Sequence, residues 1–438
     1  MNKPIAQLKR SSGTGYKVQS KSYPDKSGQV TVCRLQVAGY RFKCDMSDNT
    51  TINCFPKPKP CQMINLKLKT MKIFQLLSAF VLLALISCTQ FPGKKNLSGN
   101  DLKVTQDTFF TEMFNRDCCG YTGGDGTISI LLPDGRIVWL FGDTFLGTVN
   151  PDHTRPKMTP IFIRNSVVIQ DGDSVITLHQ GSLEKPASFA LPPPEMTGGQ
   201  RVSEDSVWFW PNNGFVEDNK LKLFLSGIMQ ADTGMWGFRW MGTWLASYSL
   251  PDITEEEIAP LSYSFENEIH YGIAILQEKG YTYVYGKKDD KPHVARFKSG
   301  DVTGPWEFYT GDDWSSNPTE SGPMSDIDVS EQFSVIKSKN KYVLISQTGA
   351  FLSPDIYSFT SDKPYTGWDQ KTLLYTTPIP ETNKNLFTYN AMAHPQFIKD
   401  GMLLISYNTN SFVLEDHFRD ADIYRPRFIR VPMKLIIP

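Results

Sequence analysis

Two short glycine-rich phrases carry the acidic residues whose types and spacing could do chemistry. The phrase at 123–126, Gly-Gly-Asp-Gly, places Asp125 just before an apolar run, and the phrase at 141–144, Phe-Gly-Asp-Thr, places Asp143 just after the next one. Two neighbouring carboxyl groups have pKa values that are pushed apart, because ionising the second beside the first is unfavourable. One can then stay protonated as a general acid while the other acts as a nucleophile or base, the arrangement used to break glycosidic bonds.

The segment between the two acids is expected to form the hairpin that positions them. Asp134-Gly135 lies between the apolar runs 127–132 and 137–141, which is a strong hairpin signal. A turn centred on this pair offsets Asp125 from Asp143 by one residue and puts them on opposite faces, unless a bulge beside a glycine brings them onto one face. The alternative is that both acids only terminate strands and form turns.

Paired apolar runs similar to this hairpin recur along the rest of the chain. Each pair is joined by a short polar turn, and the pairs are 208–215 with 221–228, 269–277 with 281–286, 333–337 with 342–347, and 392–398 with 403–408. A third strand is expected after each, at 243–249, 293–297, 355–361 and 427–432. Since such units must stack to bury their faces, the recurrence predicts an all-β, five-bladed β-propeller over residues 105–438. A jelly roll or β-sandwich is the alternative, but neither predicts this regular spacing.

Further polar candidates lie near the ends of the expected inner strands, where a propeller places ligand contacts, and Arg116-Asp117 lies just upstream of the first blade. The predicted substrate-binding residues are Arg116, Asp117, Trp210, Asn212, Asn213, His270, His394 and Asn408. Buried hydrogen bonding is the alternative role for each polar residue. Trp208, Trp236 and Trp240 could stack on sugars or fill the core, and Glu204 with Asp205 form a reserve acid pair.

The sequence offers no pattern for a catalytic metal or a nucleotide. It has six histidines and neither an HExxH nor a CxxC pattern, and no glycine-rich loop opens a helix. We therefore predict no cofactor and no metal among the site residues, although a structural Ca²⁺ remains compatible with the sequence.

An export signal is expected well inside the printed chain. Residues 71–87 combine Lys72 with an apolar run that is too short for a comfortable membrane span, as in a signal peptide. The phrase Leu-Ile-Ser-Cys at 85–88 resembles a bacterial lipobox, which implies lipidation of Cys88, a tether over 88–104, and a cell-envelope protein that faces the periplasm or the cell surface. A buried apolar helix is the alternative.

The segment 1–70 is predicted to be an upstream extension that is not translated, or a disordered segment. It contains Cys33, Cys44, Cys54 and Cys61, so a small disulfide or metal domain is the alternative. After Cys88 only Cys118 and Cys119 remain, and these two could form a vicinal disulfide or stay as buried thiols.

Charge is distributed unevenly along the chain. The segment before Met71 holds 13 of the 45 Lys and Arg residues and 3 of the 46 Asp and Glu residues, so it carries +10 and the remainder carries −11. Because the basic arm precedes an export signal and the remainder is acidic, we predict that nucleic acid is not a partner.

A resemblance adds to these expectations. The GGDG and FGDT phrases, Trp-Pro-Asn-Asn-Gly at 210–214, and the run from Tyr389 to Pro395 with 404–408 resemble an uncharacterised family of bacterial lipoproteins. That family is similar to five-bladed propeller glycoside hydrolases that include endo-D-arabinanases, and the likeness covers roughly 105–435. It implies that Asp125 and Asp143 are the catalytic pair.

The sequence thus predicts a lipid-anchored glycoside hydrolase acting on a polysaccharide or oligosaccharide, with an arabinan-like furanoside as one substrate. A glycan-binding lipoprotein without catalysis is the alternative from another class. A lyase or esterase is disfavoured because no Ser-His-Asp arrangement or GxSxG elbow is visible.

Overall fold

The computed structural model of the protein divides into two compact units, Met1–Ser98 and Gly99–Pro438. It describes residues 21–24, 31–37, 40–48 and 51–56 of the first unit, and 102–156, 161–182, 184–199, 204–234, 236–347, 352–381 and 383–438 of the second. The predicted signal peptide 71–87, Cys88 and most of the tether lie outside these residues. No helix within them is both long and apolar enough to span a membrane.

The described part of the first unit is one antiparallel sheet. Its strands follow each other in the order β1 (Lys21–Pro24), β2 (Thr31–Val37), β3 (Tyr40–Asp48) and β4 (Thr51–Pro56). The backbone register pairs Cys33 with Cys44, and Cys44 with Cys54. Our expectation that residues 1–70 are untranslated or disordered stays a prediction.

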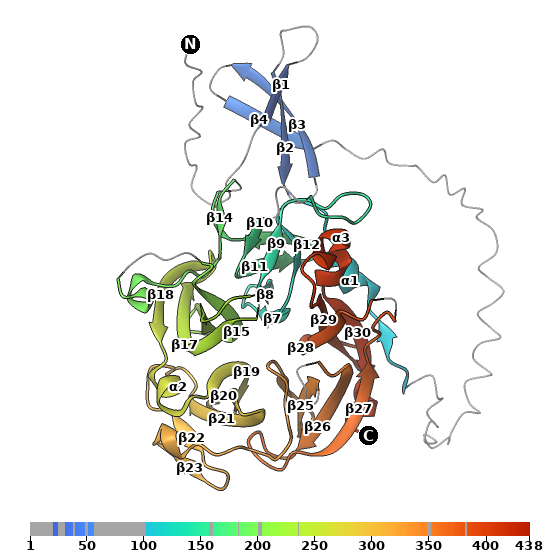
Figure 1. Cartoon of the computed structure of the whole chain (residues 1–438). Helices are drawn as coiled ribbons and strands as arrows, with labels where there is room; N and C mark the ends of the chain where they lie inside the picture. Colours follow the sequence, from blue (N-terminus) through green and yellow to red (C-terminus); the bar gives the residue numbers. More distant parts are fainter. Residues whose placement is uncertain are drawn as a thin grey trace, which may run out of the picture. The chain divides into compact units, whose positions relative to one another are not determined.

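Five antiparallel sheets of four or five strands make up most of the second unit (Figure 1). The first sheet contains β7 (Ile128–Leu131), β8 (Ile137–Phe141), β11 (Ser166–Asp171) and β12 (Ser174–Leu178). The second contains β15 (Val207–Glu217), β16 (Lys220–Gln230), β17 (Phe238–Ser249) and β18 (Thr254–Pro260). The third contains β19 (His270–Glu278), β20 (Tyr281–Lys288), β21 (Lys291–Lys298), β22 (Glu307–Tyr309) and β23 (Trp314–Ser315).

The last two sheets repeat this pattern, and the last one also holds the first strand of the unit. The fourth sheet contains β24 (Ser334–Ser338), β25 (Lys341–Gln347), β26 (Asp355–Ser361) and β27 (Asp369–Thr376). The fifth contains β28 (Leu386–Lys399), β29 (Met402–Ser411), β30 (Arg427–Pro432) and β5 (Thr105–Gln106). Because β5 pairs with β30, the two ends of the unit are joined in one sheet.

Shorter elements complete the second unit. Three strands form a small sheet beside the first one: β6 (Tyr121–Gly124), β9 (Thr144–Leu146) and β10 (Ile161–Ile163). Two more form a ribbon: β13 (Gln180–Gly181) and β14 (Pro186–Ala187). The helices are α1 (Thr108–Phe114), η2 (Pro194–Thr197), α2 (Ser262–Asn267), η3 (Pro318–Glu320), α3 (Asp416–Arg419), η4 (Ala421–Tyr424) and α4 (Met433–Ile436).

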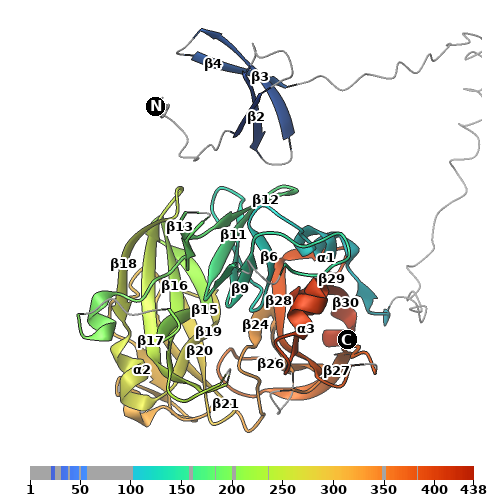
Figure 2. The ribbon, with the colours of Figure 1, turned by 45° about the horizontal axis from the view of Figure 1, so that its top comes forward.

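The first strands of the five sheets contact one another in a cycle. β7 contacts β15, β15 contacts β19, β19 contacts β24, β24 contacts β28, and β28 contacts β7 again. Figures 1 and 2 show the sheets side by side around a common centre. The prediction of an all-β domain is confirmed, and the predicted strand pairs correspond to β15/β16, β19/β20, β24/β25 and β28/β29.

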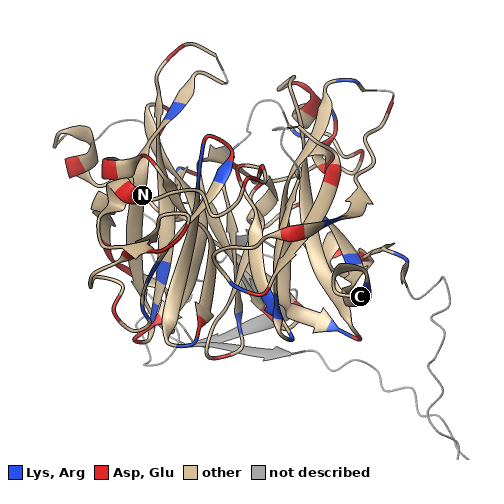
Figure 3. Ribbon diagram, turned by 90° about the horizontal axis from the view of Figure 1, so that it is seen from below, with Lys and Arg blue, Asp and Glu red and all other residues tan. Residues whose placement is uncertain are grey.

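Apolar side chains hold neighbouring sheets together. Five core clusters join neighbouring sheets of the cycle. In one of them, Phe209 and Trp244 of the second sheet share a cluster with Val138 of the first. Full burial of an aromatic side chain stabilises the folded state by about 1.5–3 kcal/mol. Figure 3 shows Lys and Arg interspersed with Asp and Glu, mostly at strand ends and in connections.

The predicted hairpin forms, but its register differs by one residue from the expected one. Ile128 lies opposite Leu140, and residues 132–136 form the turn, with the amide of Leu132 donating to the carbonyl of Arg136. The turn is therefore centred on Asp134 and not between Asp134 and Gly135. Extended outward, this register would place Asp125 opposite Asp143. The chain leaves the ladder first, because Gly126 and Thr127 have left-handed φ values of 93° and 51°.

The adjacent cysteines form a disulfide. Cys118 and Cys119 are bonded to each other, and both lie exposed in the segment between α1 and β6. The alternative expectation of two buried thiols is therefore wrong, since this segment lies at the surface.

Candidate functional site

A cavity of about 1120 Å³ opens where the first strands of the five sheets meet. Each sheet supplies lining residues at or next to its first strand, including Gly126 before β7, Asn212 of β15, Ile273 of β19, Gln332 before β24 and Tyr389 of β28. This volume exceeds the range of about 300–1,000 Å³ that is typical of small-ligand pockets. It is large enough for several linked rings.

Asp125 reaches this cavity from the turn between β6 and β7. The Tyr389 hydroxyl donates a 2.5 Å hydrogen bond to its Oδ2. The other oxygen points at Gly142, where an added β-carbon would lie 2.7 Å from Oδ1, so a larger residue there would displace the Asp125 carboxyl group. Burial raises the pKa of Asp125, and the hydroxyls of Tyr389 and Tyr424 oppose this by stabilising the carboxylate.

Asp143 lines the same cavity from the link between β8 and β9. The indole N–H of Trp210 donates to its Oδ1 at 2.9 Å, and Arg164 Nη1 lies 3.3 Å from its Oδ2. Its side chain is 18% exposed. Burial raises the pKa of Asp143 to about 7, the Arg164 charge lowers it, and the Asp125 charge raises it again. The two carboxyl groups are thus electrostatically coupled.

The position of Tyr389 depends on an irregularity in β28. The pairing of β28 with β29 shifts register between Tyr389 and Met392, and Asn390 has a left-handed φ of 55°. Such a bulge redirects a side chain out of the regular alternation of a strand. Asn410 Nδ2 donates to the Tyr389 hydroxyl at 2.9 Å, which orients its proton toward Asp125.

Three of the predicted binding residues lie at the cavity with the acid pair. Trp210 bonds to Asp143, as above, while Asn212 Nδ2 donates to Ser226 Oγ at 3.0 Å and to the Tyr271 carbonyl at 3.2 Å. His270 stacks on Trp240 with ring centroids 3.8 Å apart. Burial lowers its pKa to about 4, so the imidazole is neutral at physiological pH.

Five other predicted binding residues do not line the cavity, because internal contacts occupy them. Asn213 Oδ1 accepts a hydrogen bond from the amide of Gly214. The two ring nitrogens of His394 are hydrogen-bonded to the hydroxyls of Ser129 and Ser406, and Asn408 Nδ2 donates to Thr127 Oγ1. Both residues therefore link the fifth sheet to the first strand of the first sheet or to the residue before it.

Arg116 and Asp117 likewise lie away from the cavity. Arg425 donates to the carbonyl of Arg116 and lies 3.1 Å from Asp117 Oδ1. These contacts tie the segment after α1 to η4, which is a structural role.

The aromatic candidates and the reserve acids are divided between cavity and surface. Trp208, Trp236 and Trp240 all line the cavity, and Trp236 is 44% exposed at its mouth. Glu204 accepts the amide of Ser188, whereas Asp205 lines the cavity and lies 3.8 Å from Arg164.

Arg164, Glu331 and Tyr389 are among the polar residues of the cavity that sequence reasoning missed. Tyr389 lies in a phrase that carried the family resemblance, but nothing in its spacing relates it to Asp125. Arg164 lies in a segment for which no strand had been expected, and Glu331 precedes a strand without any motif.

Among the described residues, one acidic cluster could approach a cation. His153, Asp420 and Asp422 place ligand atoms within 4.8 Å of one another, outside the cavity. Asp422 already pairs with Arg425 at 2.7 Å, and His153 and Asp420 are exposed, so the cluster gives no sign of a built site.

The fold and the cavity define an all-β protein whose sheets converge on a pair of coupled carboxyl groups. The model of the family described as a domain of unknown function, DUF5005, matches residues 107–433, and the chain belongs to this family. No curated protein matches it. Among solved structures, a candidate hydrolase from Bacteroides ovatus has 24% identity and a TM-score of 0.64, covering 78% of this chain and 93% of that one, which shows a shared fold.

Two more distant structures are an enzyme complexed with xylotriose and an arabinanase. The GH43_1 enzyme from Xanthomonas citri complexed with xylotriose has 14% identity and a TM-score of 0.40, with 71% of this chain and 87% of that one covered. An exo-1,5-alpha-L-arabinanase from a bovine ruminal metagenomic library has 10% identity and a TM-score of 0.37, with coverages of 72% and 95%.

Proposed function

We propose that this protein is a glycoside hydrolase that cleaves a polysaccharide or oligosaccharide with Asp125 and Asp143. The observation that carries the proposal is that two coupled carboxyl groups with raised pKa values face one large cavity. A carboxyl group whose pKa lies near 7 can hold a proton and release it at neutral pH.

In this proposal the two acids have different roles. Asp143, with a pKa of about 7, donates its proton to the glycosidic oxygen as the bond between that oxygen and the anomeric carbon breaks. Asp125 acts as the carboxylate, because the Tyr389 hydroxyl bonds to its charged form. It either attacks the anomeric carbon or removes a proton from the attacking water.

We further propose that the five sheets are the blades of a five-bladed β-propeller extending over residues 105–438. The cyclic contacts of β7, β15, β19, β24 and β28 support five blades, and the pairing of β5 with β30 would close the ring. An arabinan-like furanoside is the first substrate to test, on the strength of the sequence resemblance.

The test is reducing-end release by the full chain on a panel of arabinans and other furanose and pyranose polysaccharides. Asp125→Asn and Asp143→Asn should each lower turnover by about 10²–10⁴-fold, the usual contribution of a positioned acid or base. Asp134→Asn is the matched control, since Asp134 lies in the β7–β8 turn away from the cavity. Binding without any turnover by the unmodified protein would instead support a glycan-binding protein that uses the aromatic lining.

The anchoring expected from the sequence is a separate proposal. We propose that residues 71–87 are removed and that Cys88 is lipidated in the cell envelope, supported by the lipobox-like phrase at 85–88. Mass spectrometry of the mature N-terminus tests this, and Cys88→Ser should release the protein from the membrane fraction.

A further inference from the structure

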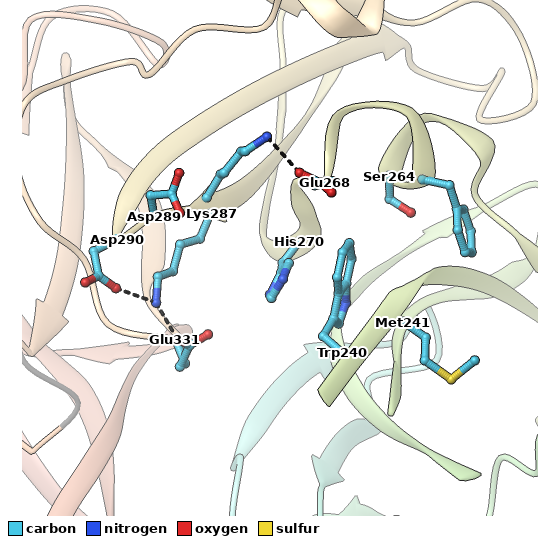
Figure 4. A pocket seen from close by; sticks show the side chains of 11 residues that line it. Trp240, Met241, Ser264, Glu268, His270, Lys287, Asp289, Asp290 and Glu331 are labelled. Atoms are coloured by element: carbon cyan, nitrogen blue, oxygen red, sulfur yellow. Dashed lines mark hydrogen bonds and ion pairs between the residues drawn. The ribbon is translucent and has the colours of Figure 1, made fainter. Parts of the chain in front are cut away.

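A second pocket, of about 560 Å³, adjoins the cavity that holds the acid pair (Figure 4). Trp240, His270 and Glu331 line both spaces, so they form a shared wall. The second pocket is otherwise lined by residues of β17, α2 and the β20–β21 turn: Met241, Ser264, Phe265, Glu268, Lys287, Lys288, Asp289 and Asp290. The sequence drew attention to Trp240 and His270 alone.

The shared wall is an aromatic surface held in place. The rings of Trp240 and His270 are stacked at 3.8 Å with an angle of 26° between them. Because His270 is neutral at physiological pH, the pair is an uncharged surface that carries imidazole nitrogens for hydrogen bonds to hydroxyl groups. A polar edge beside an apolar face suits a sugar ring.

The charged side of the wall is fixed by ion pairs. Lys287, which is 8% exposed, bonds to Glu331 and lies 2.8 Å from Asp290. Burial lowers the pKa of Lys287, but its acidic neighbours more than offset this and raise it, so the ammonium stays charged and paired. Figure 4 shows these contacts beside His270.

The lining charges of the second pocket disfavour an anionic ligand. Four acidic residues lie there, Glu268, Asp289, Asp290 and Glu331, against Lys287 and Lys288. Lys288 is itself paired, 3.3 Å from Glu268. A uronate or sulfated sugar would be repelled by this excess of negative charge, whereas an uncharged sugar would not.

We propose that the second pocket is a remote subsite for an uncharged sugar unit of the glycan that is cut at Asp125 and Asp143. This inference rests on the proposed function. A chain that fills both spaces extends well away from the bond being broken, so the enzyme favours long neutral substrates over short ones.

The test measures kcat and KM for a ladder of neutral oligosaccharides prepared from the polysaccharide that the full chain cleaves. Trp240→Ala should raise the KM of the longest oligosaccharide about tenfold relative to that of the shortest one cleaved, the loss expected for one aromatic contact. The matched control is Trp236→Ala, which removes a tryptophan that lines only the first cavity, so it should raise both KM values alike. A double variant, Glu268→Ala with Lys288→Ala, changes two solvent-accessible residues that line only the second pocket. It should act in the same direction as Trp240→Ala and guards against misfolding of the latter.

Each outcome separates the subsite from the chemistry. Turnover with an unchanged ratio of KM values in both second-pocket variants would refute the subsite and leave the hydrolase standing. If no glycan is turned over, calorimetry measures the binding of neutral oligosaccharides of increasing length, prepared from each polysaccharide of the panel. An affinity that rises with chain length and is lost in these variants would support the subsite without the hydrolase. The absence of binding to any neutral oligosaccharide, or equal affinity for oligogalacturonates, would overturn the proposal.

Discussion

The hydroxyl of Tyr389 donates a 2.5 Å hydrogen bond to Asp125 across a sequence separation of 264 residues. The contact joins the fifth sheet to the turn that precedes the first sheet, and Asn410 bonds to the same hydroxyl. A residue of the fifth sheet therefore stabilises the charged form of an acid that lies in the turn between β6 and β7.

Replacing Tyr389 by phenylalanine should weaken catalysis, because it removes the hydroxyl group that bonds to Asp125 while keeping the aromatic ring in place. The lost hydrogen bond stabilised the charged form of Asp125, so the pKa of Asp125 should rise and the acidic limb of the pH–rate profile should move to higher pH. Hydrogen bonds to charged groups are worth about 1.5–3 kcal/mol, which corresponds to a loss of roughly 10- to 100-fold in kcat. Tyr285→Phe, which removes a buried hydroxyl bonded to Pro364 O, is the matched control and should leave the profile in place.

Arg164→Gln should move the alkaline limb in a defined direction. The guanidinium lowers the pKa of Asp143, which is about 7 with Arg164 present. Without this charge the acid should hold its proton to higher pH, by about one unit or more. A pH–rate profile measured with the variant tests this, and a limb that moves to lower pH would contradict the role of Asp143 as the proton donor.

The free energy of unfolding should depend on the protonation of Asp143. Its pKa is raised in the folded protein from 3.8 to about 7, so the folded state binds the proton more tightly and stability falls as the pH rises through this window. A difference of about three pKa units corresponds to at most about 4 kcal/mol. Asp143→Asn should therefore stabilise the protein at pH 8 more than at pH 4, as measured by thermal unfolding. A larger stabilisation at pH 4 would show that the carboxyl group is not buried as described.

His394 should matter for stability and not for binding. It is fully buried between Ser129 and Ser406, and burial lowers its pKa to about 3. His394→Ala leaves both hydroxyls without this partner and opens a void, which should cost about 2–4 kcal/mol in denaturant unfolding. Below about pH 6.5 the imidazole of His394 is protonated in the unfolded chain but stays neutral in the folded protein. The free energy of unfolding of the unmodified protein should therefore decrease as the pH falls below about 6.5. A changed KM in a variant of unchanged stability would contradict this assignment.

Much of the architecture could be predicted because it is local. Apolar runs on either side of a short polar turn, such as Asp134-Gly135, predicted the β7/β8 hairpin and the later strand pairs. The strands between Thr144 and Leu178 were not predicted, since glycine, proline and polar residues interrupt their short apolar runs. The hairpin register was wrong by one residue because the turn uses five residues, 132–136.

By itself the sequence determined which acids stand at the ends of the first hairpin and that glycines surround them. Only the tertiary structure decided their partners, because Trp210, Arg164 and Tyr389 come from different parts of the chain. It also decided that His394 and Asn408 are structural while His270 faces the cavity, although all three lie in β-strands of similar pattern. The alternation of apolar and polar residues along a strand indicates which of its faces is buried. Which residue of another sheet packs against that face depends on how all five sheets pack together.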